Sequence, residues 1–316
     1  MLTTKQNFIE TLKGGSPDRF VNQYEAVSLL FHPFLLSSPL LKKGDMDVVN
    51  AWGVTKSWPI GTPGAFPVHT PDKIVIKDID HWRDYVKVPK VVYDAEEWEP
   101  FIEAAEKIDR KEQFVMPFFA PGVFEQSHYL LEIQNCLMGF YTNPDEMHEI
   151  IDMITEFELD YAAEICKYIK PDGLFHHDDW GSQLAPFFHA ETLLELVGPY
   201  MKRVVNAAHE NDFFFDLHSC GHIESLAPAM VEMGIDSWQG QSMNDKHKVA
   251  VENPRLIVDV DAPAYAPDAP EEVVRAELEK FVADYKGLPA YVGLNFGHHP
   301  QEWPILYELS RKAFSE

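Results

Sequence analysis

The chain has 316 residues, of which 46% are hydrophobic and 24% charged, a composition typical of a globular protein and not of a disordered one. It carries 26 basic and 51 acidic residues, which give a formal net charge of −25. Such a charge repels phosphate backbones and acidic bilayer surfaces, so we expect neither a nucleic acid nor a membrane as a partner.

The cysteines and the first residues indicate where the protein works. Cys136, Cys166 and Cys220 are odd in number and scattered along the chain, which is no disulfide framework and favours a reducing compartment. The opening MLTTKQNFIETLKGG has the pattern of an amphipathic helix and not of a signal peptide. The apolar stretch AVSLLFHPFLL is interrupted by histidine and proline and is too short to span a bilayer. We therefore expect a soluble, cytoplasmic protein.

In chain order, short apolar runs that end in polar residues or glycine predict seven β-strands. These runs are Phe20–Glu25, Phe114–Ala120, Gly173–His177, Phe213–Leu217, Ser237–Gln239, Leu256–Val260 and Ala290–Leu294. Longer segments with apolar residues at helical spacing separate most of them. The predicted helices are Pro144–Ile169, Ala190–Glu210, Ile223–Met233, Pro270–Tyr285 and Pro300–Phe314. This alternation indicates a parallel sheet, and the continuous apolar runs suit strands buried on both faces.

We predict that these elements form an α/β fold, a (β/α)8 TIM barrel, as a single domain over residues 1–316. The eighth strand is expected near Val48–Trp58, and an open, doubly wound sheet is the alternative. The segment Leu36–Val92 is irregular and rich in proline, glycine and tryptophan, so we expect it to form a lid or insertion on the barrel. Neither an internal repeat nor a Gly/Ser linker marks a domain boundary.

Polar side chains follow the predicted strand ends, where barrels of this kind form their active sites. The sharpest pair is His218 and Cys220, directly after the strand Phe213–Leu217. Alternate residues of an extended segment point the same way, so the two side chains can bind one metal ion. The alternative is a packed histidine beside a small buried cysteine. The further donors that could complete such a metal site are His298, His299, Asp261 and Glu125.

A second polar group, HHDDWGSQ at residues 176–183, follows another predicted strand. Two carboxylates beside two histidines would couple their titrations and prepare one group for acid or base catalysis near neutral pH. His177, Asp178 and Asp179 are therefore the candidate catalytic residues. Each aspartate has an alternative role, as a cap of the following turn or as the partner of an arginine.

Three further residues are expected to contact the substrate. Trp180 and Gln183 follow the carboxylates and could supply a planar wall and an amide, and Asn295 follows the last predicted strand. Most of the 21 Phe, 12 Tyr and 7 Trp must pack in the core, but those near the strand ends could line a pocket for a flat apolar substrate. No G-x-S-x-G, G-x-G-x-x-G or P-loop motif occurs, so neither a catalytic serine nor nucleotide binding is supported.

Three segments carry a resemblance to the uroporphyrinogen decarboxylase superfamily over nearly the whole chain. They are TTKQNFIETLKGGSPDRF from residue 3, the stretch from HHDDW at 176 to DSWQ at 239, and PEEVVRAELEKF from residue 270. The middle segment is the most specific, and it is most similar to the branch of cobamide-dependent methyltransferases. In that branch a His-x-Cys pair and a later cysteine bind zinc. Since His218 and Cys220 match the pair, the resemblance implies zinc at these residues.

Two departures from the family pattern bear on the chemistry. Uroporphyrinogen decarboxylases carry an arginine-rich segment soon after the match to Asp18-Arg19 to hold substrate carboxylates. Here the stretch that follows is FVNQYEAVSLLFHPF, which contains no arginine, and this disfavours a polyanionic substrate. The later cysteine of the methyltransferases is replaced by Gly297-His298-His299, so His298 is the expected third ligand. Zinc held by two imidazoles and one thiolate keeps a formal charge of about +1, which makes it a strong Lewis acid.

These observations predict a zinc-dependent methyltransferase that moves a methyl group between a small compound and a corrinoid protein. A methoxylated aromatic compound, which would undergo O-demethylation, is one such substrate. The D-x-H-x-x-G string of corrinoid-binding modules occurs at Asp216–Gly221, but there it is the strand end itself, so the corrinoid is expected on a separate partner. A second copy of the chain, in a homodimer, is kept as an option.

Two other functions are kept as alternatives. The first is a metal-free decarboxylase or lyase, similar to uroporphyrinogen decarboxylase, that acts on a small acid through Asp179 and His177. The second is a binding barrel that has kept the pocket and lost the chemistry. Metal content separates the methyltransferase from both, and turnover separates the two alternatives.

Overall fold

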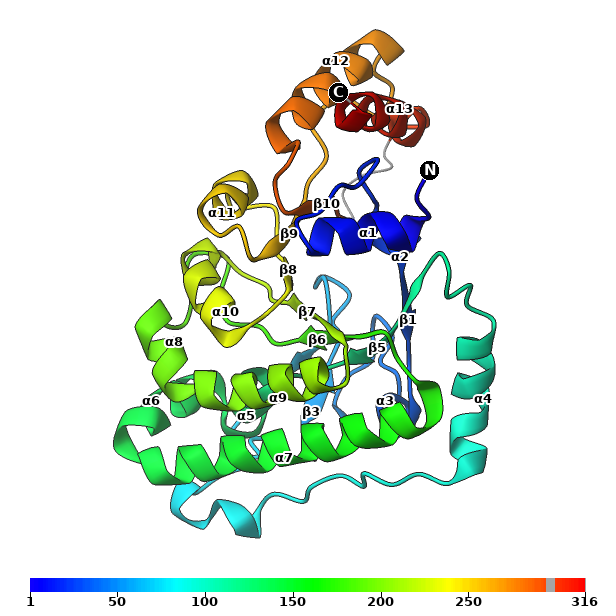
Figure 1. Ribbon diagram of the computed structural model, residues 1–316. Coiled ribbons are helices and arrows are strands. Elements are labelled where there is room, and N and C mark those ends of the chain that lie inside the picture. The colour runs from blue at the N-terminus through cyan, green and yellow to red at the C-terminus, as the bar shows by residue number, and fades with distance from the viewer. Residues whose placement is uncertain (294–298, 316) are drawn as a thin grey trace.

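The computed structural model describes residues 1–293 and 299–315. Within these residues, seven parallel strands form one curled sheet, and their order in space is their order in the chain (Figure 1). The strands are β1 (Val27–Leu30), β5 (Phe114–Phe119), β6 (Gly173–His177), β7 (Phe214–His218), β8 (Ser237–Gln239), β9 (Ile257–Val260) and β10 (Ala290–Val292). Each strand pairs in parallel with the next, so the predicted parallel α/β sheet is confirmed.

Helices connect the strands, and most of them cover the outer face of the sheet. They are α1 (Thr4–Leu12), α2 (Gln23–Ala26), α3 (Pro33–Leu36), α4 (Ala95–Glu106), α5 (Val123–Leu131), α6 (Ile133–Thr142), α7 (Pro144–Ile169), α8 (Ala190–Leu196), α9 (Gly198–Glu210), α10 (Ala227–Met233), α11 (Lys246–Glu252), α12 (Glu271–Tyr285) and α13 (Glu302–Ser315), with the 3-10 turns η1 (Ile79–Asp84) and η2 (Glu224–Leu226). The predicted helix Ala190–Glu210 is two helices, because Pro199 at the start of α9 cannot continue the hydrogen bonding of α8. In the described part of the chain, no helix is both long and apolar enough to cross a membrane.

Among the described residues, the two ends of the sheet meet at one bridge and not along a strand. Asn22 is bridged to Val292, and the Val292 N–H donates to the Val21 carbonyl at 2.9 Å. The predicted strand Phe20–Glu25 is therefore wrong beyond this bridge, since the chain enters α2 and β1 begins only afterwards. The Asn22 side chain caps α2 in a capping box, and this local hydrogen bonding outweighs the apolar character of the segment.

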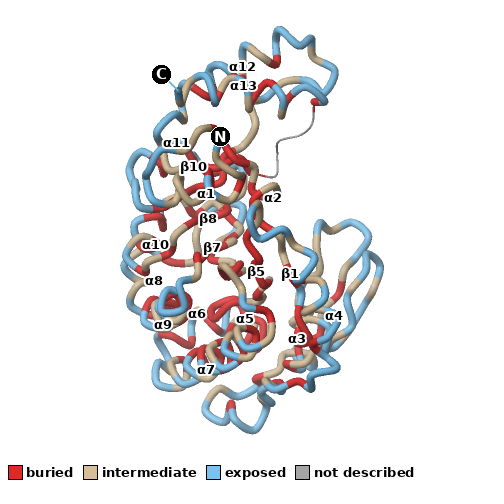
Figure 2. The backbone as a smooth tube through the Cα atoms, turned by 45° about the vertical axis from the view of Figure 1, so that its right-hand side comes forward, coloured by how far each residue is buried: buried red, intermediate tan, exposed pale blue. Residues whose placement is uncertain are grey.

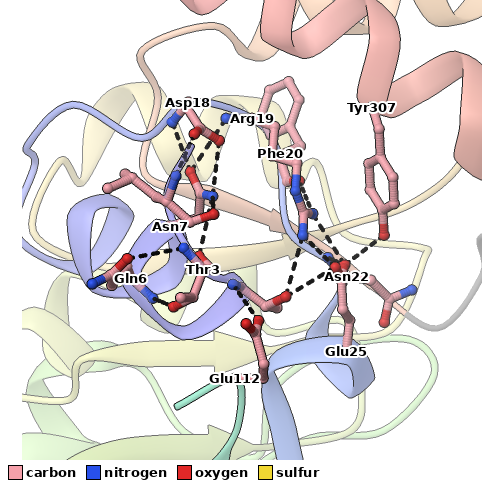
Figure 3. Close-up of polar contacts among 12 residues, drawn as sticks. Thr3, Gln6, Asn7, Asp18, Arg19, Phe20, Asn22, Glu25, Glu112 and Tyr307 are labelled. Carbon is pink, nitrogen blue, oxygen red and sulfur yellow. Dashed lines mark hydrogen bonds and ion pairs between the residues drawn. The ribbon is translucent and has the colours of Figure 1, made fainter.

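A polar network joins this bridge to helices from both ends of the chain (Figure 3). Arg19 forms an ion pair with Glu25, whose carboxylate also accepts a hydrogen bond from the Tyr307 hydroxyl of α13. Close by, the Asn7 side chain of α1 donates to the Asp18 carboxylate at 2.9 Å and accepts from the Asp18 N–H at 2.7 Å. The network therefore holds α1, α2 and α13 against one another.

The space inside the curled sheet is apolar at the N-terminal ends of the strands. Phe8 of α1 lies against Phe114, Phe214 and Tyr291, with ring centroids 5.4, 5.6 and 5.2 Å away. These three residues come from β5, β7 and β10, which are not neighbours, so the sheet must curl around the Phe8 ring. The other buried members of this inner cluster are Val21, Ala26, Val27, Met116, Phe175 and Ile257. A larger apolar layer lies between the strands and the helices, and most of the backbone of the sheet is coloured as buried in Figure 2.

A separate, three-stranded antiparallel sheet lies between β1 and β5 in the chain. It consists of β2 (Val48–Val49), β3 (Thr55–Ser57) and β4 (Phe66–Pro67). The eighth strand expected near Val48–Trp58 is therefore wrong, because these residues pair only within the small sheet. The segment after it lies against α5, where the Ile76 N–H donates to the Leu130 carbonyl at 3.0 Å. The described residues thus form a curled, TIM-barrel-like sheet of seven strands, and the complete (β/α)8 barrel is not seen among them.

Candidate functional site

His177 and His218 end two neighbouring strands and lie side by side. They are paired in register between β6 and β7, and their rings are stacked with centroids 4.7 Å apart. Residues two apart on a strand share a face, so both imidazoles lie on the face that carries Phe175 and Phe214 of the inner cluster. The pair therefore stands at the C-terminal edge of the sheet, at the opposite end from Phe8.

The side chains of Cys220 and His218 lie close together, as the alternation of side chains along an extended segment predicted. The His218 Nε2 atom lies 3.3 Å from the Cys220 Sγ atom. A tetrahedral zinc ion holds one nitrogen and one sulfur about 3.5 Å apart, so this pair needs little movement to bind one. The chain turns at Gly221, whose φ is +102°, and a Cβ there would lie 2.6 Å from the carbonyl carbon of Gly181. The two loops that carry the site are thus packed backbone against backbone.

Asp179 and His177 bring further ligand atoms to the same place. One atom each of His177, Asp179 and His218 lie within 4.8 Å of one another, and the Asp179 carboxylate accepts a hydrogen bond from the Cys220 N–H at 2.7 Å. Imidazole nitrogen, thiolate sulfur and carboxylate oxygen are the ligands that zinc uses in proteins. The residues at this edge of the sheet therefore fit a zinc ion.

Burial sets the protonation of the His218 and Cys220 pair. Burial, assisted by the charge of the neighbouring His177, lowers the pKa of His218 to about 3, so its imidazole is neutral near pH 7. Burial, followed by the charge of Asp179, raises the pKa of the Cys220 thiol well above its usual range. The neutral imidazole is ready to bind a cation, whereas the thiol must lose its proton to do so. Metal binding at this pair would therefore release a proton.

Glu125, in the first turn of α5, connects His177 to the helix. Its Oε2 atom lies 2.8 Å from His177 Nδ1, and its Oε1 atom accepts from the Tyr129 hydroxyl at 2.6 Å. Burial opposes the charge on Glu125, but the charge and hydrogen bond of His177 outweigh it and lower the Glu125 pKa to about 2. Burial likewise opposes the charge on His177, but Glu125 raises the His177 pKa to about 9. At neutral pH the pair is a carboxylate and an imidazolium that can donate a proton.

From the sequence, Glu125 was expected only as one of the further donors that could complete the metal site, and its contact with His177 was not predicted. The available signal was the spacing of Glu125 and Tyr129, which are four residues apart and so share one helix face. That spacing predicts the bond within α5. It does not predict that α5 faces the end of β6.

Asp178 is fully buried, and its carboxylate contacts α5. It accepts hydrogen bonds from the N–H groups of Phe124 at 3.3 Å and Glu125 at 2.6 Å, and from the Trp180 indole at 2.9 Å. These contacts cap the start of α5, which precedes Asp178 in the chain, and so differ from the expected alternative role as a cap of the following turn. Burial raises the pKa of Asp178 to about 7.

The residues expected to contact the substrate lie in different settings. Trp180 is fully buried, whereas Gln183 is exposed and donates to the Gln241 side chain at 3.2 Å. Asn295 lies outside the described residues. His176, the first residue of the polar segment, points to the other face of β6, where it lies 2.9 Å from a buried glutamate of α7.

The expected third metal ligand, His298, also lies outside the described residues. Both ring nitrogens of His299, its alternative, form hydrogen bonds with backbone groups, at 3.0 and 3.2 Å. Asp261, another reserve ligand, forms an ion pair with Lys246 at 3.2 Å. Among the described residues, the possible metal ligands that do lie beside the His218 and Cys220 pair are His177 and Asp179.

Comparison with known proteins gives a family and a fold. The model of the family described as uroporphyrinogen decarboxylase (URO-D) matches residues 58–302, and no curated protein matches the sequence. A solved methyltransferase from Methanosarcina mazei has a TM-score of 0.64 at 15% identity, with 100% of both chains covered. The structure of an archaeal fructose 1,6-bisphosphate aldolase has a TM-score of 0.31 at 14% identity, and the match covers 48% of this chain and 62% of the aldolase chain. The TTHB071 protein from Thermus thermophilus, soaked with ZnCl2, has a TM-score of 0.30 at 15% identity. This match covers 69% of this chain and 94% of the TTHB071 chain. The first of these structures shares the fold.

Proposed function

This chain belongs to the uroporphyrinogen decarboxylase family, and we propose that it acts as a zinc-dependent methyltransferase, with residues 1–316 as one domain. The observation that carries the proposal is the approach of His218 Nε2 to Cys220 Sγ at 3.3 Å, at strand ends where such folds place their active sites. The likeness to a methyltransferase over the whole chain and the His-x-Cys resemblance support this choice within the family.

His218, Cys220 and His298 are the proposed zinc ligands, with His298 in place of the later cysteine of related methyltransferases. When bound, zinc supplies a Lewis acid that lowers the pKa of a coordinated heteroatom. The neutral state of the His218 imidazole and its short distance from Cys220 support these two ligands.

His177 and Asp179 are proposed to manage the proton on the substrate heteroatom. Methyl transfer from an ether leaves an oxygen that must take up a proton, and transfer to an alcohol or thiol requires a proton to leave. The His177 imidazolium, held by Glu125 at 2.8 Å, can donate the proton in the first direction. Asp179, whose pKa is raised by burial and then by the charge of Glu125, can accept it in the second. Asp178 supports both by capping α5, which carries Glu125.

The methyl group is proposed to move between a small, compact compound, such as a methoxylated aromatic, and a corrinoid bound to a separate protein. Lys246 is paired with Asp259 and Asp261 at 3.1 and 3.2 Å. It is therefore not available to bind the carboxylates of a porphyrin-like acid. Gln183 and Asn295 are the proposed substrate contacts, whereas Trp180 is fully buried and donates to Asp178.

Metal analysis and a methyl-transfer assay test the proposal. We expect one zinc per chain in the purified protein and transfer of a methyl group from a methoxylated aromatic compound to free cob(I)alamin. Substoichiometric zinc that does not change in Cys220→Ala would contradict the metal site. Tighter binding of a porphyrin-like polycarboxylate than of any small methoxylated compound would contradict the substrate class.

A metal-free decarboxylase is the second candidate, and the ion pair between His177 and Glu125 favours it. Loss of carbon dioxide from an acid leaves a carbanion that must be protonated, and the His177 imidazolium can supply that proton with Asp179 as its neighbour. Release of carbon dioxide from a small acid by protein stripped of metal would favour this candidate over the methyltransferase.

A further inference from the structure

A cavity of about 450 Å³ lies at the N-terminal end of the curled sheet, opposite the end that carries His218 and Cys220. It is lined by the end of α1 and by Ile257 and Ala290, which begin β9 and β10. Both of these residues are buried, as is Phe20, which lines the cavity with them. A cavity of this size, with an apolar wall and a few polar groups, is typical of a site for a small molecule.

The lining of this cavity is basic in a chain that is acidic. Arg19, Arg255 and Lys286 line it together with one acidic residue, Glu10, whereas the whole chain carries 51 acidic and 26 basic residues. The Glu10 carboxylate accepts a hydrogen bond from the Ser16 N–H at 2.9 Å. Within the described chain, neither Arg255 nor Lys286 forms an ion pair. The cavity can therefore attract an anion that the molecule as a whole repels.

Arg255 and Lys286 lie on neighbouring loops at the exposed side of the cavity. The strands that follow them are paired in parallel, with Val258 opposite Ala290, and the Val258 N–H donates to the Pro289 carbonyl at 3.0 Å. Each cation comes only a few residues before its paired strand position. A guanidinium and an ammonium on adjacent loops can bind one carboxylate between them.

Arg19 adds a buried donor to the same cavity. Its side chain is 5% exposed, and a guanidinium has five N–H groups. Its terminal nitrogens make four hydrogen bonds, with the Phe20 carbonyl, the Thr4 hydroxyl and both oxygens of Glu25 (Figure 3). The fifth group, Nε–H, has no hydrogen-bond partner among the residues that the structure describes. Because buried donors almost always have an acceptor, a molecule held in the cavity can supply the one that is lacking.

We propose that this cavity is a binding site for a small organic acid. The carboxylate of the acid is held by Arg255 and Lys286, its apolar body lies against Phe20 and Ile257, and a second polar atom accepts from the Arg19 Nε–H. The site is separate from the proposed zinc site and does not depend on it. Since Arg19 also belongs to the network that joins the sheet ends, a bound acid should stabilise the folded chain.

Three probes of related size and charge test the class of ligand. 4-Hydroxybenzoate has the carboxylate, the ring and a second polar atom, 4-hydroxybenzamide lacks the charge, and inorganic phosphate lacks the body. We expect saturable binding of 4-hydroxybenzoate by calorimetry, with a higher Tm, and binding of the other two that is about tenfold weaker or more. Equal binding of all three probes, or of none, overturns the proposal.

A double variant tests the location. Arg255→Gln with Lys286→Gln changes two exposed residues and should weaken binding of 4-hydroxybenzoate by about tenfold or more, with the zinc content unchanged. Lys42→Gln with Lys43→Gln is the matched control, since it removes the same two charges from exposed positions before β2. The control should bind as the wild type does. Wild-type affinity in the first variant, or equal weakening in both, overturns the site.

The role of Arg19 can be read in the wild-type protein without a substitution. Nitrogen–hydrogen correlation spectra resolve arginine Nε–H groups, and through-bond correlation to the backbone assigns the signal of Arg19. We expect this signal to shift during the titration and to saturate at the same 4-hydroxybenzoate concentration as the calorimetric binding. A signal that stays in place while the acid binds overturns the assignment of the acid to this cavity.

Discussion

The two ends of the curled sheet use the same strands but different side chains. Along the inner face of β7, Phe214 is followed by Asp216 and then by His218. The N-terminal end is filled by aromatic and aliphatic side chains around Phe8, whereas the C-terminal end collects histidines, carboxylates and a thiol. The inner face of β7, a strand of five residues, therefore carries a core side chain at its N-terminal end and a candidate site residue at its C-terminal end.

Because their side chains differ in this way, the two ends can be altered separately. Large apolar side chains at one end contribute buried area, and their loss should lower stability without changing the polar groups. The polar groups at the other end contribute little buried apolar area, and their loss should remove metal or turnover without unfolding the chain. Substitutions at each end test that separation.

The largest effect is expected for Cys220→Ala, which should lose the zinc and with it all methyl transfer, because the thiolate is one of only three proposed ligands. Elemental analysis of the purified variant measures the loss. Cys166→Ala is the matched control, since Cys166 is a half-buried cysteine of α7, and it should keep one zinc per chain. Equal zinc content in Cys220→Ala and Cys166→Ala would contradict the placement of the metal site at the C-terminal edge of the sheet.

Asp179→Asn is expected to lower turnover by about 10²- to 10⁴-fold, the contribution typical of a group that moves protons. The metal should stay bound, because Asp179 is proposed to lie beside the ligands and not among them. Rate and zinc content are measured on the same preparation. Loss of zinc would make Asp179 a ligand. Full activity would show that Asp179 has no catalytic role and serves only to accept the hydrogen bond from the Cys220 N–H.

At the other end of the sheet, Phe8→Ala is expected to lower the free energy of unfolding by about 3 to 5 kcal/mol, because it leaves a cavity among the rings of three strands. Unfolding in denaturant measures the loss, and zinc content under native conditions should be unchanged. Phe66→Ala removes a ring that is 51% exposed on β4 and should have a much smaller effect. Zinc loss in Phe8→Ala, in a variant still folded, would show that the two ends are coupled.

The network at the junction of the sheet ends should make stability depend on pH. Burial raises the pKa of Glu25, but its hydrogen bonds with Arg19 and Tyr307 outweigh burial and lower the pKa below the usual 4.5. A carboxyl group with a lowered folded pKa contributes stability above its unfolded pKa and loses it as the pH falls through the folded value. We therefore expect stability to fall from about pH 4.5 downward.

Glu25→Gln should flatten that acid limb and cost about 1 to 3 kcal/mol at pH 7, since Arg19 loses its charged partner. Denaturant unfolding at several pH values measures both effects. Glu308→Gln, which breaks an exposed ion pair with Arg275, should change stability much less. An unchanged acid limb in Glu25→Gln would place the titrating group elsewhere.

The parts of the fold and site that follow local rules could be predicted from the sequence. Parallel strands with buried runs, the approach of His218 and Cys220, and the clustering of polar residues at strand ends all follow from alternation along a strand. The family also follows from the segment that contains these residues. Each of these features depends on neighbours in the chain or on a repeated pattern.

The parts that depend on distant partners could not be predicted. The segment Phe20–Glu25 is apolar enough for a strand, but a capping box turns it into α2. The residues near Val48–Trp58 form strands whose partners lie in their own small sheet. Glu125 gains its role only because Asp178, on another strand end, caps α5 and fixes that helix beside His177.

The hydrogen bond between Tyr307 and Glu25 joins residues 282 positions apart in the chain, and this separation has a consequence for how the protein folds. Contacts that close so long a loop are slow to form, and during synthesis the earlier partner must wait for the later one to leave the ribosome. The contact between Asp179 and Cys220 spans only 41 positions. The strands that carry His218 and Cys220 can therefore pair before α1 and α13 meet.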